Sequence, residues 1–221
     1  MIIAIKLAVI AIVAYLLGSI PFGLIFSRAI AHVDIRKFGS GNIGATNVLR
    51  TLGPRVGIPT LIMDLAKAAL AVLAGMFIIG NEPLVMLGLD VHVQAAQALS
   101  ALMAVVGHNW SIFLKFKGGK GVATFIGGLL VINPIVALVG AGIGIIIALA
   151  TRYVSLGSIL GSLAVLLIIG ALTALALTAP VYLAYILVAV AIIIYQHRSN
   201  IQRLQAGKEL KLGDKSSRVG R

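Results

Sequence analysis

Long apolar stretches separated by short polar ones dominate the chain. They cover residues 3–26, 57–80, 93–107, 121–132, 134–150, 156–178 and 180–196. Several approach or exceed the ~20 residues that an α-helix needs to cross a bilayer. The pattern therefore predicts an all-α fold, a polytopic helical membrane protein with about seven transmembrane segments.

The stretch 121–150 allows two interpretations. It is either one long tilted helix or two short helices broken at Asn133-Pro134. Helices over 121–132 and 134–150 would each be short for a full bilayer. In that case this region should tilt, thin the bilayer or lie partly buried in protein.

The distribution of charge favours two helices in this stretch. Lysine and arginine gather in the first polar loop, near residue 116, at Arg152 and in the tail after residue 196, whereas the loop 81–92 carries Glu82 and Asp90 and no lysine or arginine. Seven crossings place every basic segment on one side, whereas six would move Arg152 and the tail to the other. Because basic loops face the cytoplasm, we expect the N-terminus outside and the C-terminus in the cytoplasm.

The composition supports a membrane protein and narrows the classes of function. Hydrophobic residues make up 60% of the 221 residues and charged residues 11%. The formal net charge of +12 would suggest nucleic acid in a soluble protein. Here basic cytoplasmic loops explain it, so no nucleic-acid partner is expected. The absence of cysteine excludes disulfides and thiolate metal sites. The apolar N-terminus lacks a small-residue cleavage site, so we interpret it as a transmembrane segment rather than a signal peptide.

Four polar stretches fall on the predicted cytoplasmic side. They are GSGNIGATNVLR (39–50), GHNWSIFLKFKGGKGVAT (107–124), TRYVSLGS (151–158) and HRSNIQRL (197–204). Glycine loops expose backbone N–H groups, and Arg50 and Lys120 add cations, a combination that suits phosphate oxygens. Single glycine loops are often only turns and lysines only topology signals, but four such stretches on one face favour a ligand site. A nucleotide P-loop is excluded because Lys120 is followed by Gly121 rather than by serine or threonine.

Charged and imidazole side chains beside or within the apolar segments are further candidates. Asp64 and Lys67 are three residues apart, hence on one helix face. Each charge costs ~2.5–3.5 kcal/mol at a helix centre, so both should pair or face the protein interior. The pair could lock helix packing or take part in substrate binding. His108 and His197 could each be a general base, a hydrogen-bond donor or neither.

The polar stretches resemble those of one known family, the bacterial acyl-phosphate:glycerol-3-phosphate acyltransferases (PlsY family). The motifs that carry the resemblance are, in order, GSGNIGATNVLR, FKGGKGVAT, RYVSLGS and HRSNIQRLQAGKE. The resemblance extends from YLLGSIPFG in the first apolar segment to Glu209. It implies a membrane enzyme that transfers a fatty acyl group from acyl phosphate to the 1-hydroxyl of glycerol 3-phosphate. The products would be lysophosphatidic acid and phosphate, in the first acylation of phospholipid synthesis.

The resemblance also implies roles for individual residues. The substrate phosphate pocket is expected to comprise Ser40, Arg50, Lys120, Ser158, His197 and Asn200. The acyl phosphate is expected to lie on loops that include Gly41, Asn42, Thr46, Asn47, Gly118 and Gly119. Of all these, the expected catalytic residues are Lys120, Arg50, Ser40 and His197. No cofactor or metal is expected.

The expected organisation is one integral membrane catalytic domain, residues 1–205, followed by a polar basic cytoplasmic tail, residues 206–221. The resemblance implies a bacterial inner-membrane protein with its active site on the cytoplasmic face. Its expected partners are glycerol 3-phosphate, acyl phosphate, membrane lipids and the soluble enzyme that makes acyl phosphate.

Two questions stay open at the level of sequence. The general base is either His197 or a phosphate oxygen of glycerol 3-phosphate itself. No histidine is followed five residues later by aspartate, which is the pattern of acyltransferases with soluble donors. The alternative function is an anion or phosphate transporter. A transporter would need polar groups on both faces, often from inverted repeats, whereas the predicted external loops are short and poor in donors.

Overall fold

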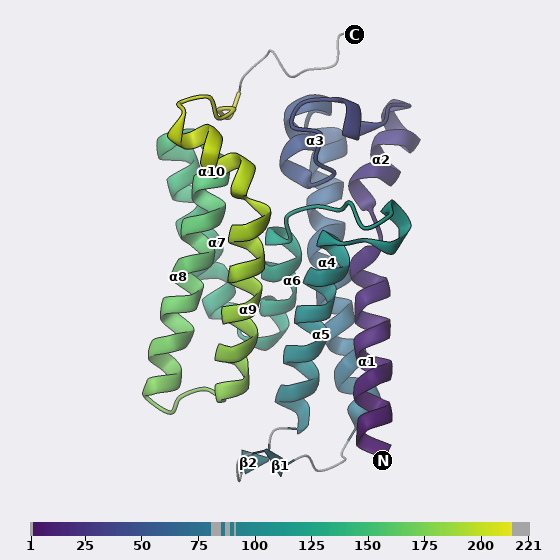
Figure 1. The fold of residues 1–221 in the computed structure, drawn as a ribbon, viewed down its shortest axis with the longest axis vertical. Coiled ribbons are helices and arrows are strands. Elements are labelled where there is room, and N and C mark those ends of the chain that lie inside the picture. The colour runs from purple at the N-terminus through teal and green to yellow at the C-terminus, as the bar shows by residue number, and fades with distance from the viewer. Residues whose placement is uncertain (1, 81–84, 87–88, 91, 214–221) are drawn as a thin grey trace.

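The apolar blocks form helices that run roughly along one direction (Figure 1). The computed structural model describes residues 2–80, 85–86, 89–90 and 92–213. The helices are α1 (Ile2–Ser19), α2 (Phe22–Ala31), η1 (Ile35–Lys37), α3 (Ala45–Leu52), α4 (Pro54–Ile79), α5 (His92–Asn109), η2 (Ile112–Leu114), α6 (Val122–Ile132), α7 (Pro134–Thr151), α8 (Val154–Ala174), α9 (Pro180–Gln196) and α10 (Arg198–Gln205). The short strands β1 (Val85–Met86) and β2 (Leu89–Asp90) pair antiparallel. Several charged residues of the topology argument lie outside the described residues, namely Glu82, Lys215, Arg218 and Arg221.

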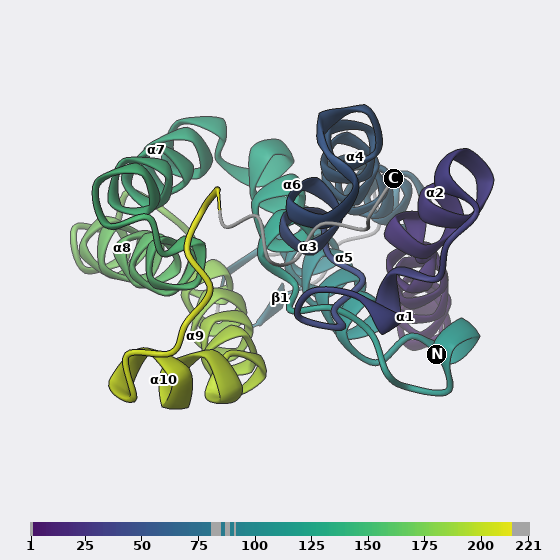
Figure 2. The ribbon, with the colours of Figure 1, turned by 90° about the horizontal axis from the view of Figure 1, so that it is seen from above.

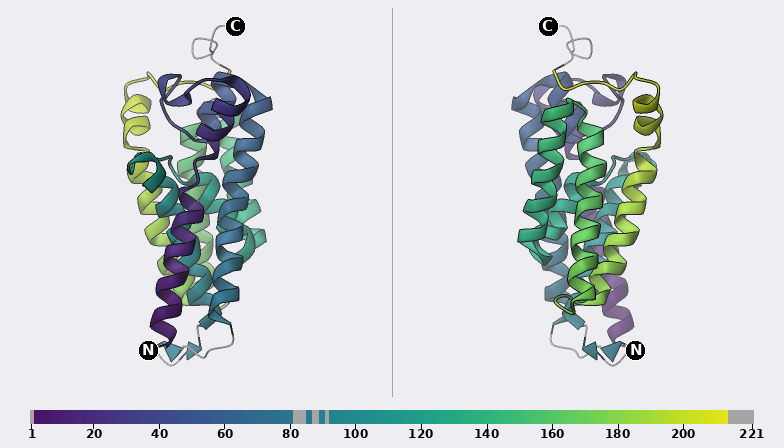
Figure 3. Two further views of the ribbon diagram at one scale, coloured as in Figure 1. Left: turned by 90° about the vertical axis from the view of Figure 1, so that its right-hand side faces the viewer. Right: turned by 90° about the vertical axis from the view of Figure 1, so that its left-hand side faces the viewer.

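The two ends of the bundle carry different elements. The N-terminus and the β1–β2 pair lie at one end, called here the hairpin end, and α2, α3 and α10 lie at the other (Figure 1). Both side views in Figure 3 show the same separation. We call the second end the basic end because its elements carry Arg28, Arg36, Arg50 and Arg203. Lys6 is at the hairpin end, where it donates to the Ile79 carbonyl oxygen at 3.0 Å.

The break predicted at Asn133-Pro134 is confirmed. Asn133 ends α6 and also caps α7, because its side chain accepts a hydrogen bond from Val136 N at 3.1 Å. Pro134 occupies the first turn of α7, where a missing N–H does no harm. With 11 residues, α6 is only about 16 Å long, roughly half the thickness of a bilayer core.

Within the described residues, four stretches are long and apolar enough to cross a membrane, and a fifth is added if the bent pair α9 and α10 counts as one span. The first stretch joins α1 to α2 across Pro21, and the others are α4, α7 and α8. Many large apolar side chains on the outside of the bundle are exposed, among them Phe77, Ile135 and Leu167. An apolar exterior of this kind suits contact with lipid. The number of crossings and the orientation of the termini stay predictions.

The interior combines a continuous apolar core with close helix contacts at glycine. The largest core cluster joins Val72 of α4, Val105 of α5, Phe125 of α6 and Ile186 of α9. Helices α7 and α8 approach so closely that a Cβ at Gly157 would lie 2.2 Å from the carbonyl oxygen of Gly144 on α7. Small residues allow such contacts between membrane helices.

Seen from above, α7 to α10 lie on one side of the molecule and α1 to α4 on the other, with α5 and α6 between them (Figure 2). The chain after α10, residues 206–213, is called here the C-terminal strap. Its Leu212 pairs with Arg152 at the α7–α8 turn: Leu212 N donates to the Arg152 carbonyl oxygen at 2.7 Å, and the Arg152 side chain donates back to Leu212 O at 2.9 and 3.2 Å. The strap thus joins α10 to α7 and α8 at the basic end.

Candidate active site

A cavity of about 370 Å³ lies at the basic end and brings together most of the predicted site residues. Those on its wall are Ser40, Asn42, Thr46, Asn47, Arg50, Lys120, Ser158, His197 and Asn200. Three predicted glycines are not on this wall. Gly41 and Gly118 line a neighbouring hollow, and Gly119 is buried against His108.

Asn47 shapes the first glycine loop. Its amide oxygen accepts from Ser40 N at 2.9 Å, and its amide nitrogen donates to the carbonyl oxygens of Phe38, at 3.1 Å, and Asn42, at 2.8 Å. The Asn42 side chain in turn accepts from Gly44 N at 2.8 Å. Asn47 is 2% exposed and its side-chain hydrogen bonds all go to the loop backbone. It therefore holds the loop in shape, while the exposed side chains of Ser40 and Thr46 are accessible to a ligand.

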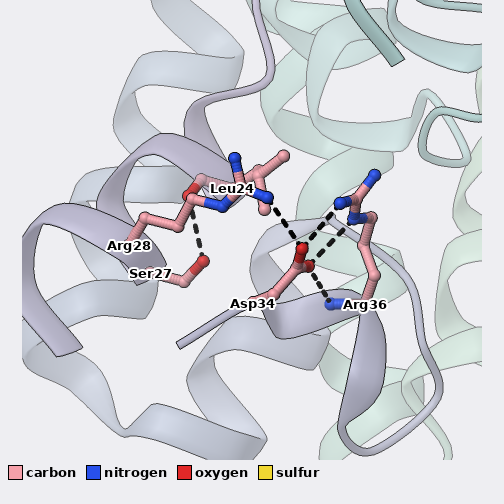
Figure 4. Close-up of polar contacts among 5 residues, drawn as sticks. All are labelled: Leu24, Ser27, Arg28, Asp34 and Arg36. Carbon is pink, nitrogen blue, oxygen red and sulfur yellow. Dashed lines mark hydrogen bonds and ion pairs between the residues drawn. The ribbon is translucent and has the colours of Figure 1, made fainter. Parts of the chain in front are cut away.

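The turn that leads into this loop is anchored by Asp34 (Figure 4). The carboxylate accepts from Arg28 at 2.8 Å and from the Arg36 guanidinium at 2.6 and 2.9 Å. These bonds, the one from Arg36 above all, hold the pKa of Asp34 well below its usual range. In the same view, Ser27 Oγ donates to the Leu24 carbonyl oxygen at 3.0 Å inside α2. The anchor joins the end of α2 to η1, directly before the glycine loop.

The second glycine loop folds back on the end of α5. Gly118 N donates to Asn109 O at 3.0 Å and Gly119 N to His108 O at 2.9 Å. A Cβ at Gly119 would lie 2.0 Å from His108 Nε2, so no larger residue fits there. Gly121 has φ = 84°, a conformation that glycine adopts without strain, and it begins α6. The loop thus delivers Lys120 to the cavity at the start of a helix.

The Lys120 ammonium donates to the side-chain oxygen of Asn200 on α10. Burial lowers the pKa of Lys120 to about 8; the negative charge of Glu209 opposes this shift, and the positive charges of Arg203 and Arg50 add to it. Arg50 also donates to the Leu210 carbonyl oxygen of the C-terminal strap at 3.4 Å. The wall of the cavity is therefore strongly cationic.

Glu209 is a buried carboxylate on this cationic wall and was not among the site residues predicted from the sequence. It accepts from Asn200 Nδ2 at 2.6 Å, from Ser155 Oγ at 2.8 Å and from Arg203 Nε at 2.8 Å. Burial by itself would raise its pKa, but these hydrogen bonds outweigh burial and leave the pKa below its usual value. Glu209 ties α8, α10 and the strap together. The only sequence signal was its place at the end of the motif HRSNIQRLQAGKE.

His197 follows α9 and is also buried. Its Nδ1 donates to the Ile193 carbonyl oxygen at 2.8 Å, because a carbonyl oxygen can only accept. Burial and the nearby Lys120 charge lower the pKa of His197 to about 4. The imidazole is therefore neutral at pH 7, with Nε2 as an acceptor. In the described part of the chain, no group of three or more His, Cys, Asp or Glu side chains could hold a metal ion.

A family profile for glycerol-3-phosphate acyltransferase matches residues 8–207. The chain belongs to this family. A glycerol-3-phosphate acyltransferase of Thermoanaerobacter sp. (strain X514) is 42% identical over 206 residues, covering 93% of this chain and 96% of that protein. Glycerol-3-phosphate acyltransferase 3 of Dehalococcoides mccartyi (strain CBDB1) is 43% identical over 211 residues, covering 96% and 98%.

The fold also resembles solved structures of this family. The crystal structure of PlsY, an integral membrane glycerol 3-phosphate acyltransferase, in its glycerol 3-phosphate form superposes with a TM-score of 0.79 at 36% identity and covers 94% of this chain and 96% of that one. A form with lysophosphatidic acid gives a TM-score of 0.78. This acyltransferase is accordingly a helical integral membrane enzyme, and the family predicted from the sequence is confirmed.

The cavity of this glycerol-3-phosphate acyltransferase has a second, apolar part. Beyond the cations, its wall continues between α4, α6, α7 and α8 with small or apolar residues, which include Leu61, Leu65, Ile126, Ala141, Ile145 and Ala148. Asp64 and His108 also line the cavity. A single cavity thus joins a cationic region to an apolar region that lies among the membrane helices.

Proposed function

We propose that this acyltransferase takes its acyl group from acyl phosphate, acylates the 1-hydroxyl of glycerol 3-phosphate, and releases lysophosphatidic acid and inorganic phosphate. The observation that carries the proposal is the single cavity with a cationic and an apolar region. Both substrates bear phosphate, and one also bears an acyl chain that belongs in lipid. The related PlsY structure with lysophosphatidic acid supports the product.

The size of the cavity favours a small activating group on the donor. About 370 Å³ lies near the lower end of the range for ligand pockets, which is ~300–1,000 Å³. A donor with phosphate as its leaving group adds little volume beside glycerol 3-phosphate. The nucleotide of acyl-CoA would have to lie outside this cavity, where the sequence offers only general basic charge.

In this reaction the polar residues of the cavity wall bind the two substrates. Ser40, Arg50, Ser158, His197 and Asn200 bind the phosphate of glycerol 3-phosphate, together with Lys120. The loops of Gly41 to Asn47 and of Gly118 to Gly121 hold the acyl phosphate. In these roles Asn42 and Thr46 contact the ligand, whereas Asn47, Gly41, Gly118 and Gly119 act by shaping the loops, which agrees with their bonds and positions.

The reaction is a direct acyl transfer. The 1-hydroxyl oxygen attacks the acyl carbonyl carbon, a new carbon–oxygen bond forms, and the bond from that carbon to the phosphate oxygen breaks. Lys120 and loop N–H groups stabilise the negative charge on the carbonyl oxygen and leaving phosphate. The hydroxyl proton goes to a phosphate oxygen of glycerol 3-phosphate and finally to the released phosphate. The low pKa of His197 supports this base over the imidazole.

The experiment compares donors on the purified protein. We expect palmitoyl phosphate to release phosphate only when glycerol 3-phosphate is present, and palmitoyl-CoA to support little or no turnover. The activity should persist in EDTA. Equal rates with palmitoyl-CoA would overturn the proposed donor, and loss of activity in EDTA with recovery in magnesium would overturn metal-independent transfer.

We place the protein in the bacterial inner membrane, with residues 1–205 as the main part of the catalytic domain, the tail 206–221 in the cytoplasm and the active site on that side. Glu209 and Leu210 of the strap complete the cavity wall, so the start of the tail belongs to the site. A soluble enzyme can then deliver acyl phosphate to the basic end. Because the chain has no cysteine, single cysteines report topology directly. Ser199→Cys on α10 should be labelled only from the cytoplasm, and Leu177→Cys after α8 only from outside. Labelling of both from one side would overturn this orientation.

A further inference from the structure

Asp64, Lys67 and His108 form a buried polar cluster between α1, α4 and α5. Their exposed fractions are 2%, 2% and 4%. Lys67 Nζ lies 2.7 Å from Asp64 Oδ1, an ion pair whose angles do not fit a hydrogen bond, and donates to the Ile20 carbonyl oxygen at 2.9 Å. The ammonium also lies 2.9 Å from His108 Nδ1 and 5.9 Å from the centre of the Phe22 ring. The adjacent carboxylate is the partner of opposite sign that a buried ammonium group needs.

The charge on Lys67 decides which nitrogen of His108 carries the proton. An ammonium group can donate but cannot accept, so Nδ1 must accept from Lys67. The neutral imidazole then carries its proton on Nε2. Asp64 Oδ1 is 3.7 Å from Nδ1, too far for a competing hydrogen bond. The cluster therefore holds His108 as a donor at Nε2.

Nε2 of His108 lies beside the second glycine loop. Gly119 leaves room for it, since a Cβ there would come within 2.0 Å of Nε2. His108 lines the cavity together with Lys120 and with Leu65 of the apolar part. Among the described residues, Nε2 has no hydrogen-bond partner, and Nδ1 has Lys67. The cavity wall thus includes a residue whose Nε2 has no hydrogen-bond partner among the described residues.

We propose that His108 is a catalytic residue whose Nε2–H donates to the carbonyl oxygen of the acyl phosphate, and that Lys67 is a positioning residue that sets the tautomer required. This inference rests on the proposed donor. In acyl phosphate the carbonyl stands between the phosphate and the chain, and His108 shares one cavity with the cation of Lys120 and with apolar Leu65. As the hydroxyl oxygen attacks, negative charge builds on the carbonyl oxygen. When the bond to phosphate breaks, the carbonyl double bond forms again and the negative charge leaves with the phosphate. His108 keeps its proton throughout.

A purely structural role accounts for less of this arrangement. A cluster that only fastened α1, α4 and α5 together would need Asp64, Lys67, the Ile20 carbonyl and, for the contact with α5, His108 Nδ1. It would not need a histidine that lines the cavity, nor a glycine packed directly against the second nitrogen of its imidazole. The two readings differ in their kinetics, because a donor to the transition state acts on kcat and a packing element acts on the amount of folded protein.

The first test is a pair of substitutions at His108. His108→Leu should lower kcat at least ~10²-fold, as loss of one oxyanion donor does, with the KM for glycerol 3-phosphate changed less than about threefold. His108→Gln places an amide N–H near the position of Nε2 and should recover kcat at least about tenfold over His108→Leu. His32→Asn, an exposed histidine away from the cavity, is the matched control and should behave as the unmodified enzyme. A kcat of His108→Leu within about threefold of the unmodified enzyme overturns the proposal.

The second test reads the tautomer of His108 directly. In protein labelled with ¹⁵N-histidine, the His108 signals, assigned by their loss in His108→Gln, should show an unprotonated Nδ1 and a protonated Nε2. A protonated Nδ1 overturns the role of Lys67. In the charge-balanced double variant Asp64→Asn/Lys67→Met, Nδ1 should no longer be held unprotonated, and its signal should show a mixture of the two tautomers. The kcat should fall, whereas the KM for glycerol 3-phosphate should stay unchanged.

The donor proposal and the His108 proposal fail in different ways. If the unmodified enzyme uses palmitoyl-CoA and palmitoyl phosphate at equal rates, the proposed donor is wrong. The kcat values of the His108 variants with palmitoyl-CoA then still show whether Nε2–H donates to the acyl carbonyl oxygen. If palmitoyl phosphate is the donor and His108→Leu keeps its kcat, the proposed function stands and the role of His108 falls.

Discussion

We expect Lys120→Ala to lower kcat at least ~10²-fold. The Lys120 ammonium lies on the cavity wall against Asn200, and the glycines on both sides of it let the backbone bring it close to a ligand. Burial lowers its pKa to about 8, which is still above pH 7, so the side chain is mainly an ammonium at neutral pH. The substitution therefore removes a charged donor from a partly desolvated site.

The size of the effect follows from what the ammonium binds. A hydrogen bond to a charged group contributes ~1.5–3 kcal/mol. A donor aimed at charge that develops in the transition state contributes ~2.7–4 kcal/mol, equivalent to ~10²–10³ in kcat. Arg50 and Arg203 remain on the same wall after the substitution. We therefore expect the loss to lie near the lower bound of this range rather than to abolish turnover.

The assay is steady-state release of phosphate from palmitoyl phosphate by purified, correctly inserted variants. Lys115→Ala is the matched control, because Lys115 belongs to the same loop, is exposed and does not line the cavity; its kcat should stay within about twofold of the unmodified enzyme. Lys120→Arg should also fail, since a flat guanidinium does not replace a compact ammonium between glycines. A near-normal kcat for Lys120→Ala would refute the reasoning and leave the loop as a turn with topology signals.

Three further results are expected. Because burial lowers the pKa of Lys120 to about 8, kcat/KM for glycerol 3-phosphate should fall as the pH rises through about 8, where the ammonium loses its charge; a pH–rate profile that stays flat to pH 10 would contradict this. Glu209→Gln removes the negative charge that raises the pKa of Lys120, so the same fall should move to lower pH, and an unchanged profile would count against the coupling. Arg50→Ala should raise the KM for glycerol 3-phosphate more than it lowers kcat, as for a ground-state phosphate contact; a loss confined to kcat would instead place Arg50 at the transition state.

The positions of the helices and the outline of the site could be predicted from the sequence because both depend on local features. Uninterrupted apolar runs gave the long helices, and Pro134 after Asn133 gave the break between α6 and α7. The clustering of cations and glycines in a few polar stretches indicated an anion site, and most of its predicted residues do line one cavity. The family resemblance rested on the same stretches.

Only the tertiary structure decided which partner each polar group has. The partners of Glu209 lie on α8 and α10, the strap meets Arg152 sixty residues earlier, and Lys67 meets His108 forty-one residues later. The sequence identified these residues as charged or polar but not as neighbours, because helices of similar apolar composition can pack in many ways. The same holds for Asn47, whose amide the fold uses to shape a loop. The pKa values of Lys120 and His197 depend on how deeply these side chains are buried. Their burial depends in turn on which helices pack around them, and no local pattern along the chain specifies that packing.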